Sequence, residues 1–402
     1  MVDVSETTIL GISDSSVCGG AALLRGGRIV AAVNEERLNR QKMSTGFPER
    51  SIRRVLEMEN LSPEDIDHVY AADEYNYFKP ESTRWQGWLV DETGSGKGIL
   101  YKLASEVSGL IGSSSLAQDA YYAIRRRLTA GRRKKLPRLL QETFDFRCPV
   151  SFVDHHYSHA LAAYYTGGHP DATVITLDGG GDGLCSRVYR VRNGSFELLN
   201  TVRSYHSIGN FYAYVTHICG YTAHKHEGKI TGLAARGEPV YLELLDDLIT
   251  YEDGQFRNRG RCYFESAVRK IRKRLPADFR KQDLAASIQK LLEKHAVRYC
   301  DYWVQQSGIG HVVLCGGVFA NVRLNQFIHE LPSVDTIFVH PGMGDDGLAF
   351  GAALTPRAGG GDSGDAVSAG SPLSDVYFGP GYTDADIEEV LRRQGLEFVY
   401  EP

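Results

Sequence analysis

The sequence lacks paired cysteines and long apolar runs. Its seven cysteines are scattered over 402 residues, and none stands in a Cys-x-x-Cys pair. This pattern excludes a disulfide framework or a cysteine zinc site and is typical of reduced thiols. No apolar run reaches 18 residues, which excludes a membrane-spanning helix. The first residues have neither a basic start nor a long apolar core, so we expect no secretory signal and a cytoplasmic protein.

Positive charge is also in short supply. Lys and Arg number 45 against 50 Asp and Glu, which gives a net charge of −5. Without a global basic field, nucleic acid is not an expected partner. One basic run, RRRLTAGRRKK at Arg125–Lys135, interrupts this pattern. It is either a docking surface for an acidic partner or RNA, or a solvated helix and turn. The lack of a pattern of stacking aromatics favours the second.

The expected elements repeat along a chain that is too long for a typical single core. The first set has strands at Thr7–Ile12, Ala21–Leu24, Ile29–Val33 and His68–Ala72, with a helix opening at Pro48. The second set has strands at Ala172–Leu177, Ser186–Arg190, Phe196–Val202, His311–Leu314 and Thr336–Val339, with helices at Asp283–Trp303, Asn321–Ile328 and Gly347–Leu354. The shared order predicts an α/β fold in which two RNase-H-like halves face a cleft, as in the actin-like ATPase architecture.

The predicted domain organisation follows this repeat. We expect one half over residues 1–170, with a helical insertion at about 81–148, and the other over residues 171–356. Residues 357–372 are rich in Gly and Ser, which is typical of a flexible linker. Residues 373–402, with a short helix at Asp384–Gln394, resemble the start of a further unit that is cut short. The sequence therefore predicts a fragment, or a stand-alone half that needs a partner.

A candidate metal site begins at the segment DHHYSH. His155 and His159 are spaced i, i+4, so both rings lie on one side of a helix and suit a divalent metal. His156 with His159 is an alternative pair, and capping or core histidines are the structural alternative. Asp178 ends the apolar strand TVITLD, where a carboxylate is costly without a partner such as a metal.

A second acidic segment, HPGMGDDG, precedes the last expected helix of the second half. Asp345 is the fourth candidate metal ligand. The alternative is a helix-capping segment, in which Asp346 would serve well.

Glycine-rich turns are candidates for binding a nucleotide's phosphates. The run that follows Asp178 contains Gly179 and Gly180, whose small size lets backbone N–H groups approach a phosphate. The segment Asp14–Ala21, DSSVCGGA, occupies the matching place in the first half, so the two hairpins could hold phosphates from both sides. Neither segment is a P-loop, and hairpin turns favour glycine for structural reasons too.

Two further segments are candidates for the rest of the nucleotide. In CGGVFAN, Gly316 and Gly317 would let adenosine lie on the backbone, and Asn321 could bond its ribose or base. The alternative is a strand-to-helix turn with Asn321 as the helix cap. Lys229, in EGKITGLAARG, could pair with a phosphate, or it is an ordinary surface lysine.

Six segments in order resemble one known family. NEERLNRQKMSTGFP, DHHYSHALAAYY, LDGGGDG, GKITGLAARG, GGVFANVRLN and GDDGLAFGAAL are similar to the N-terminal domain of the NodU/CmcH/TobZ-type O-carbamoyltransferases, over nearly the whole chain. That domain is similar to the tRNA threonylcarbamoyltransferase subunit TsaD and shares its actin-like fold. The resemblance implies that a C-terminal YrdC-like domain, in cis or in trans, makes carbamoyl-adenylate from ATP and carbamoyl phosphate. The actin-like domain then transfers the carbamoyl group to a hydroxyl and releases AMP.

The resemblance also implies roles for single residues. The ligands of an iron(II)-type site that touches the nucleotide phosphate would be His155, His159, Asp178 and Asp345. The adenosine-side contacts would be Gly316, Gly317 and Asn321. This sequence departs from the family in its first hairpin, which usually holds a His-Asp pair whose histidine has a catalytic role. No histidine stands between residues 15 and 20, so Asp14 is the nearest candidate acid or base.

The sequence therefore predicts an O-carbamoyltransferase acting on a hydroxylated small molecule, such as a sugar or an intermediate of natural-product or antibiotic biosynthesis. One alternative is TsaD-like tRNA modification, which the net acidity, the linker and the tail after residue 372 disfavour. A sugar kinase of the same fold would not need two histidines spaced i, i+4. The missing hairpin histidine favours a last alternative, a non-catalytic nucleotide-binding partner subunit.

Overall fold

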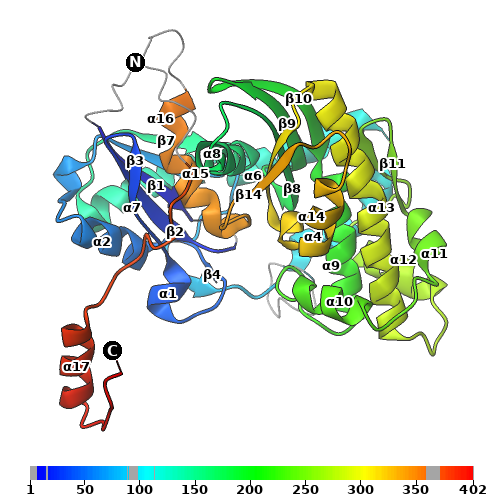
Figure 1. Cartoon of the computed structure of the whole chain (residues 1–402). Helices are drawn as coiled ribbons and strands as arrows, with labels where there is room; N and C mark the ends of the chain where they lie inside the picture. Colours follow the sequence, from blue (N-terminus) through cyan, green and yellow to red (C-terminus); the bar gives the residue numbers. More distant parts are fainter. Residues whose placement is uncertain are drawn as a thin grey trace.

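The computed structural model describes residues 7–14, 17–87, 89, 98–112, 114–358 and 372–401. Most of the expected linker, residues 359–371, lies outside these ranges. The described chain forms two five-stranded sheets with helices around and between them (Figure 1). Within these ranges no helix has the length and apolar character needed to cross a bilayer.

The first sheet has the strand order β3-β2-β1-β5-β7. Its strands are β1 (Thr8–Ser13), β2 (Gly20–Arg25), β3 (Arg28–Asn34), β5 (His68–Ala72) and β7 (Val150–Val153). The first three form an antiparallel meander, and β5 and β7 continue from β1 in parallel. Helix α2 (Glu49–Met58) packs against the meander with Ile52, Val55 and Leu56 buried, as its periodicity predicts.

The second sheet repeats this arrangement in the order β10-β9-β8-β13-β14. Its strands are β8 (Asp171–Gly181), β9 (Leu184–Arg192), β10 (Ser195–Arg203), β13 (His311–Cys315) and β14 (Thr336–Val339). The antiparallel and parallel pairings match those of the first sheet. The prediction of an actin-like α/β fold with two similar halves is thus confirmed. Strand β8 runs further than expected, because the ladder resumes where Gly181 pairs with Leu184 beyond the glycine run.

Two helices join the sheets at the centre of the molecule (Figure 1). Helix α8 (His155–Gly167) packs against β8 and β13, whereas α15 (Leu348–Ala353) packs against β1, β2 and β5. The two helices also pack against each other. Gly351 permits this close contact, because a Cβ added there would lie 1.8 Å from the carbonyl oxygen of Ser158. The helices that position the site are therefore held between both sheets.

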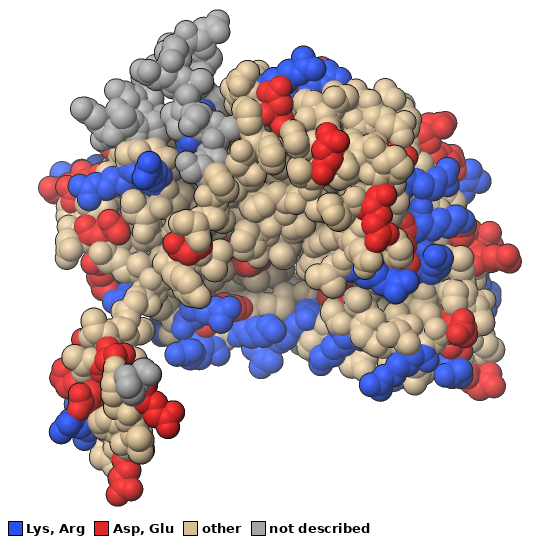
Figure 2. Space-filling view, in the orientation of Figure 1, with Lys and Arg blue, Asp and Glu red and all other residues tan. Residues whose placement is uncertain are grey.

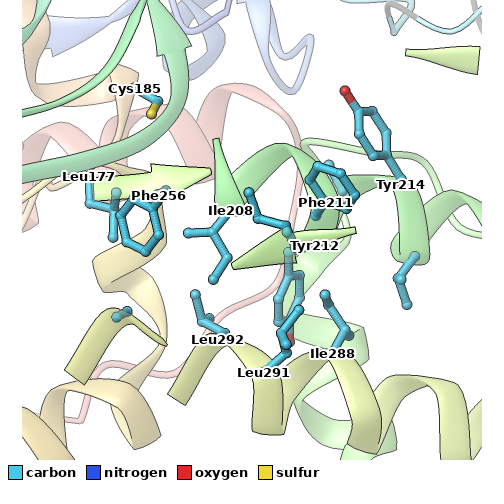
Figure 3. Close-up of a cluster of buried hydrophobic side chains, with 14 of the residues drawn as sticks. Leu177, Cys185, Ile208, Phe211, Tyr212, Tyr214, Phe256, Ile288, Leu291 and Leu292 are labelled. Atoms are coloured by element: carbon cyan, nitrogen blue, oxygen red, sulfur yellow. The ribbon is translucent and has the colours of Figure 1, made fainter. Parts of the chain in front are cut away.

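The second half has a large helical core. Helices α9 (Ile208–Ile218) and α13 (Lys281–Ser307) pack together, and Figure 3 shows Ile208 and Tyr212 facing Leu291 and Leu292. The sequence analysis missed α9. Nearly all its residues are buried, so it has no alternation between a polar and an apolar face. The remaining helices of this half are α10 (Glu227–Ala234), α11 (Leu242–Asp246), α12 (Glu265–Arg274) and α14 (Val322–His329), and its hairpin is β11 (Ile249–Glu252) with β12 (Gln255–Asn258).

The insertion in the first half is helical, as predicted. It contains α4 (Gly98–Glu106), α5 (Ser108–Ile111), α6 (Ser115–Thr129) and α7 (Arg132–Phe144). The basic run covers the end of α6 and the start of α7, and most of its cations are exposed. Arg125 is half-buried, and Arg132 is buried, with 1% of its surface exposed. The expectation of a solvated helix and turn is therefore wrong at Arg132.

Short elements complete the described chain. They are α1 (Glu35–Asn39), β4 (Ser44–Thr45), β6 (Thr83–Arg84), α16 (Thr355–Ala358) and α17 (Asp384–Arg393). Strands β4 and β6 pair as a two-stranded ribbon. Figure 1 shows α17 standing away from the two sheets. A capping box between Thr383 and Asp386 starts this helix.

Candidate functional site

The site begins at the first turn of α8. The side chain of Asp154 accepts a hydrogen bond of 2.9 Å from the backbone N–H of Tyr157 and so caps the helix. His155 and His159 follow one turn apart, with ring centroids separated by 4.7 Å. Both are buried in the interior. The predicted helical spacing of the two histidines is therefore confirmed.

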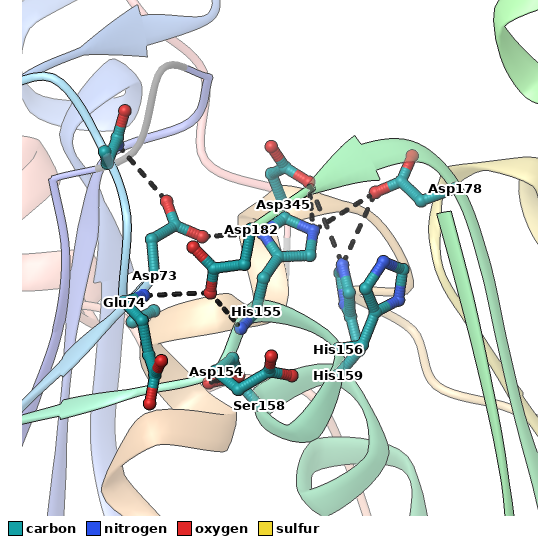
Figure 4. A network of polar contacts seen from close by, with 12 residues as sticks. Asp73, Glu74, Asp154, His155, His156, Ser158, His159, Asp178, Asp182 and Asp345 are labelled. Atoms are coloured by element: carbon teal, nitrogen blue, oxygen red, sulfur yellow. Dashed lines mark hydrogen bonds and ion pairs between the residues drawn. The ribbon is translucent and has the colours of Figure 1, made fainter. Parts of the chain in front are cut away.

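Two carboxylates face the same pair of rings (Figure 4). An oxygen of Asp178, from β8, lies 3.4 Å from Nε2 of His155 and 3.5 Å from Nε2 of His159. An oxygen of Asp345, which precedes α15, lies 3.7 and 3.8 Å from the same atoms. One ligand-type atom from each residue fits within 4.8 Å of the others. The structure thus brings together all four predicted metal ligands.

His156, the other histidine of the alternative pair, is not part of this cluster. Nδ1 of His156 lies 2.9 Å from the hydroxyl of Thr176 on β8. A helix turns by about 100° per residue, so neighbouring side chains point in different directions. His156 is therefore a core histidine, whereas His155 and His159 face the carboxylates.

The four side chains fit a divalent metal by their contacts. Within the described part of the chain, Nε2 of His159 is buried and accepts or donates no hydrogen bond. Nδ1 of His155 lies 2.6 Å from Oδ1 of Asp73, and such an outer carboxylate fixes the ring so that Nε2 faces the cluster. Two imidazole nitrogens and two carboxylates form a donor set that suits first-row transition metals.

The electrostatics of the cluster also favour a cation. Burial and then the negative charge of Asp178 raise the pKa of Asp345 well above its ordinary value. Burial acts in the same direction on Asp178, but contacts with His155 and His159 hold its pKa well below the ordinary value. Without a further positive charge, the two half-buried carboxylates therefore compete to be ionised. A bound cation would let both carry their charge.

An outer network fixes the ends of the strands around the cluster. The carboxylate of Asp182 accepts hydrogen bonds from the backbone N–H groups of Glu74 at 2.8 Å, Tyr75 at 2.7 Å and His155 at 2.9 Å. Burial, together with the charges of Asp73 and Asp154, raises the pKa of Asp182 to about 6. The hairpin between β8 and β9 is thereby held against the segment that follows β5 of the first sheet.

Asp14, the candidate acid or base, forms a buried ion pair. Nε of Arg132 lies 3.1 and 3.0 Å from its two carboxylate oxygens. Arg132 also donates to the backbone carbonyls of Ala72 and Asp73 at the end of β5. Asp14 is 1% exposed and does not line the cavity beside the cluster. This placement disfavours proton transfer by Asp14, whose catalytic role stays a prediction.

A cavity of about 440 Å³ lies against the carboxylates of the cluster. This volume is in the range of small-molecule sites. Both halves contribute to its walls. The predicted site residues among them are Asp178, Gly179, Gly180, Gly317, Asn321 and Asp345. The cavity therefore joins the candidate metal ligands to most of the candidate nucleotide contacts.

Gly317 and Asn321 form one wall of this cavity. A Cβ added at Gly317 would lie 3.2 Å from Oδ1 of Asp178. The side chain of Asn321 accepts a 3.1 Å hydrogen bond from the N–H of Leu324 and donates one of 2.8 Å to Gln289. Asn321 is thus the helix cap that the sequence left as an alternative, and it lines the cavity as well.

Two predicted contacts do not reach the cavity. Gly316 has φ of 103°, and a Cβ there would lie 2.3 Å from the carbonyl oxygen of Leu177, so packing explains this glycine. Lys229 is exposed, with Nζ 5.3 Å from the ring centroid of Tyr221. Their contacts with a nucleotide stay predictions. Lys225, which the sequence analysis did not single out, lines the cavity instead.

The first hairpin reaches the cavity through Val17 and Cys18. Cys18 therefore lies in the segment where the resembling family usually has its histidine. Burial and the charges of Asp345 and Asp346 raise the pKa of its thiol, so Cys18 stays protonated. Residues 15 and 16 lie outside the described residues. The prediction that both hairpins face one site is met by Val17 and Cys18 on one side and Gly179 and Gly180 on the other.

Comparison with known proteins gives one family. The sequence model described as "Carbamoyltransferase N-terminus" matches residues 8–354. The nodulation protein NolNO of Sinorhizobium fredii is 30% identical over 391 residues, which are 93% of this chain and 50% of that protein. The uncharacterised protein sll1178 of Synechocystis is 28% identical over 415 residues, 98% of this chain and 64% of that protein. The chain thus spans about half to two thirds of the length of these relatives.

Solved structures with a similar arrangement are distant. HypF of T. kodakarensis has a TM-score of 0.45 and 13% identity, over 87% of this chain and 48% of that one. Component A of (R)-2-hydroxyglutaryl-CoA dehydratase from Acidaminococcus fermentans has a TM-score of 0.42 and 17% identity, over 88% of this chain and 100% of that one. At these values neither carries an argument about function.

Proposed function

Because this chain belongs to the carbamoyltransferase N-terminus family, we propose that it moves a carbamoyl group from carbamoyl-adenylate to a hydroxyl of a small molecule. The observation that carries the proposal is a cluster of two histidines and two aspartates whose carboxylates lie on the wall of a cavity of about 440 Å³. The same wall exposes glycine backbone at positions 179, 180 and 317. It therefore offers places for a cation, for phosphate oxygens and for a flat ring.

The metal ligands in this proposal are His155, His159, Asp178 and Asp345. Iron(II) is the metal that the resemblance implies, and the mixed nitrogen and oxygen donors accommodate it. Such a cation would offset phosphate charge and polarise the transferred group. Asp73 holds His155 so that Nε2 points into the cluster.

The nucleotide is proposed to lie with its phosphate near Gly179 and Gly180 and its adenosine along Gly317 and Asn321. A side chain at Gly179 would overlap the ring of His224, with Cβ 2.4 Å from a ring carbon. Glycine at this position avoids that overlap, and the exposed Gly180 leaves its backbone open to a phosphate. The cavity thus orients the carbamoyl group toward Asp178 and Asp345.

In the transfer step the acceptor oxygen forms a bond to the carbamoyl carbon. The bond between that carbon and the phosphate oxygen of AMP breaks, and AMP leaves with the electron pair. The hydroxyl proton passes to a base or to the departing phosphate. Positioning of both reactants in one cavity supplies a large part of the rate enhancement in such reactions.

The source of carbamoyl-adenylate belongs to the proposal too. We place its synthesis from ATP and carbamoyl phosphate in a YrdC-like domain that acts in cis or in trans. We also propose a cytoplasmic reaction in sugar or natural-product modification, without nucleic acid as a partner.

Synthetic carbamoyl-adenylate tests the function directly. The chain, supplied with iron(II) and a panel of sugars and polyols, should release AMP together with an O-carbamoylated product detectable by mass spectrometry. Asp178→Asn should slow AMP release by about 10- to 100-fold, because a metal ligand is weakened. His156→Gln is the matched control and should keep the rate. AMP release that is equal in wild type, Asp178→Asn and buffer alone would favour the alternative of a non-catalytic nucleotide-binding subunit.

A further inference from the structure

Positive side chains gather at the rim of the cavity, although the whole chain carries a net charge of −5 and four acids line the cavity itself: Asp178, Glu227, Asp345 and Asp346. Lys225 and Arg125 line the cavity. Lys42, Arg84 and Lys229 lie close enough to Lys225 to act on it electrostatically. Figure 2 shows Lys and Arg side chains along the lower edge of the hollow between the two halves. We call Lys42, Arg84, Lys225 and Lys229 the cationic collar.

Two cations of the collar come from the first half of the molecule. Ser44 pairs with Arg84 in the ribbon of β4 and β6, and the N–H of Trp85 donates to the carbonyl of Met43 at 3.1 Å. The side chains of Met43 and Trp85 line the cavity. Lys42 and Arg84 immediately precede these two residues, so the ribbon places both cations beside the rim of the cavity, near Lys225.

The other two cations come from the second half. The ring of Trp85 meets the ring of His224 edge-on, with centroids 6.5 Å apart. Lys225 follows His224, and Lys229 lies in the first turn of α10, which begins at Glu227. Cations from both halves therefore face each other where the ribbon meets α10.

This arrangement is electrostatically unfavourable in the free protein. Burial, and then the charges of Arg84 and Lys42 with a contribution from Lys229, lower the pKa of Lys225. Glu36 acts on Lys225 in the opposite direction, and one of its carboxylate oxygens accepts a 2.8 Å hydrogen bond from the N–H of Met43. In the described part of the chain no ion pair neutralises a member of the collar. Clustered like charges that are not needed for packing point to an anionic ligand.

We propose that the cationic collar binds a phosphate or pyrophosphate group of a small molecule and bridges the two halves through it. A phosphate carries two negative charges and several acceptor oxygens, so cations from both sides can bind it at once. The collar is basic and suits an anion, whereas the acidic cluster at Asp178 and Asp345 suits a cation. The molecule that carries this phosphate is either the nucleotide donor or a phosphorylated acceptor. In naming it, the inference deepens the proposed function and rests on it.

Calorimetry with inorganic pyrophosphate tests the collar. The chain is first treated with chelator, so that no metal recruits the probe. Wild type should bind pyrophosphate, with an affinity that falls as sodium chloride rises. Lys42→Ala/Arg84→Ala should weaken binding by about tenfold or more, because charge-assisted hydrogen bonds are lost. Arg272→Ala/Lys273→Ala removes the same charge from the exposed face of α12 and should bind like wild type.

Parallel titrations with ATP and adenosine identify the source of the phosphate. If it belongs to the donor, the double variant loses ATP affinity but keeps adenosine affinity, and pyrophosphate competes with ATP. If it belongs to the acceptor, ATP affinity is unchanged and pyrophosphate binds beside ATP. Both results support the collar. Equal pyrophosphate binding by wild type and the double variant, or none by wild type, overturns it.

Two further measurements keep the outcome interpretable. Circular dichroism of the double variant should show an unchanged thermal transition, and the exposed Lys229→Glu should repeat the loss of pyrophosphate binding without touching the ribbon. If the chain binds pyrophosphate through the collar but transfers no carbamoyl group, the collar proposal stands and the proposed function is refuted.

Discussion

Arg132 is the residue that holds the edge of the first sheet together. It pairs with Asp14 at the end of β1 and donates to two carbonyls at the end of β5. The next contact in this series joins Asp73 to His155. A side chain from the insertion therefore positions the strand end that orients a candidate metal ligand.

Replacing this arginine should be costly. Arg132→Leu leaves the carboxylate of Asp14 buried without a partner, which typically costs about 3–5 kcal/mol of unfolding free energy. Denaturant titration measures the loss. Arg133→Leu is the matched control, because Arg133 is 45% exposed and its neighbour Glu74 lies 3.8 Å away. The control should change stability by roughly 0.5 kcal/mol or less. Equal stability of both variants would contradict the role given to Arg132.

At the scale of elements, the contact between α8 and α15 determines how the cluster is assembled. Helix α8 carries His155 and His159, and Asp345 lies just before α15. The helices approach closely because Gly351 has no side chain facing Ser158. The distance between the histidines and Asp345 therefore depends on the packing of these two helices.

A methyl group at this contact should disturb the metal site from a distance. In Gly351→Ala the new Cβ would overlap the carbonyl of Ser158, so the helices must separate. We expect metal affinity to fall by about 10- to 100-fold, as when a supporting contact of a ligand is lost. Competition with a metal-binding dye measures it. Gly232→Ala in α10 is the control, since nothing lies within 4 Å of the added Cβ. Unchanged affinity in Gly351→Ala would show that the helices can part without moving the ligands.

Elements with a clear local pattern could be predicted from the sequence. Strands β5 and β14 have the predicted bounds, and helix α13 extends only a few residues beyond the range predicted for it. Three metal candidates could be found because helical spacing, for His155 and His159, and a strand-end carboxylate, for Asp178, are local signals. Asp345 was found from an acidic segment before a helix together with the family resemblance. Helix α9 is buried on nearly all sides and gives no such signal. Arg132, Asp73 and Lys225 were missed because their partners lie far away in the sequence, 118 residues in the case of Arg132 and Asp14.

At the scale of the molecule, two five-stranded sheets of matching strand order dominate the described residues, and both halves contribute to one cavity. The metal cluster lies against one wall of this cavity through its two carboxylates. The cationic collar lies where the β4–β6 ribbon meets α10. A phosphate-bearing ligand would contact groups from both halves. Binding of the metal and of the nucleotide should therefore be coupled.

Removal of metal should weaken nucleotide binding. After dialysis against chelator, we expect ATP affinity to fall by about tenfold or more, because the phosphate then faces the acidic side chains of the cluster without the cation that would offset its charge. By thermodynamic linkage, ATP should raise metal affinity by the same factor. Calorimetry in both orders measures the coupling. Adenosine lacks phosphate and should bind equally with and without metal. An ATP affinity that does not change on treatment with chelator would show that the nucleotide does not bind next to the metal cluster.

The central claim is that His155, His159, Asp178 and Asp345 hold one metal ion. Elemental analysis of protein purified anaerobically without chelator tests it most directly, in wild type, His159→Ala and His156→Gln. The structure predicts about one divalent transition metal per chain in wild type and in His156→Gln, because His156 contacts Thr176 instead of the cluster. It predicts loss of the metal in His159→Ala. Equal metal content in wild type and His159→Ala would contradict the account.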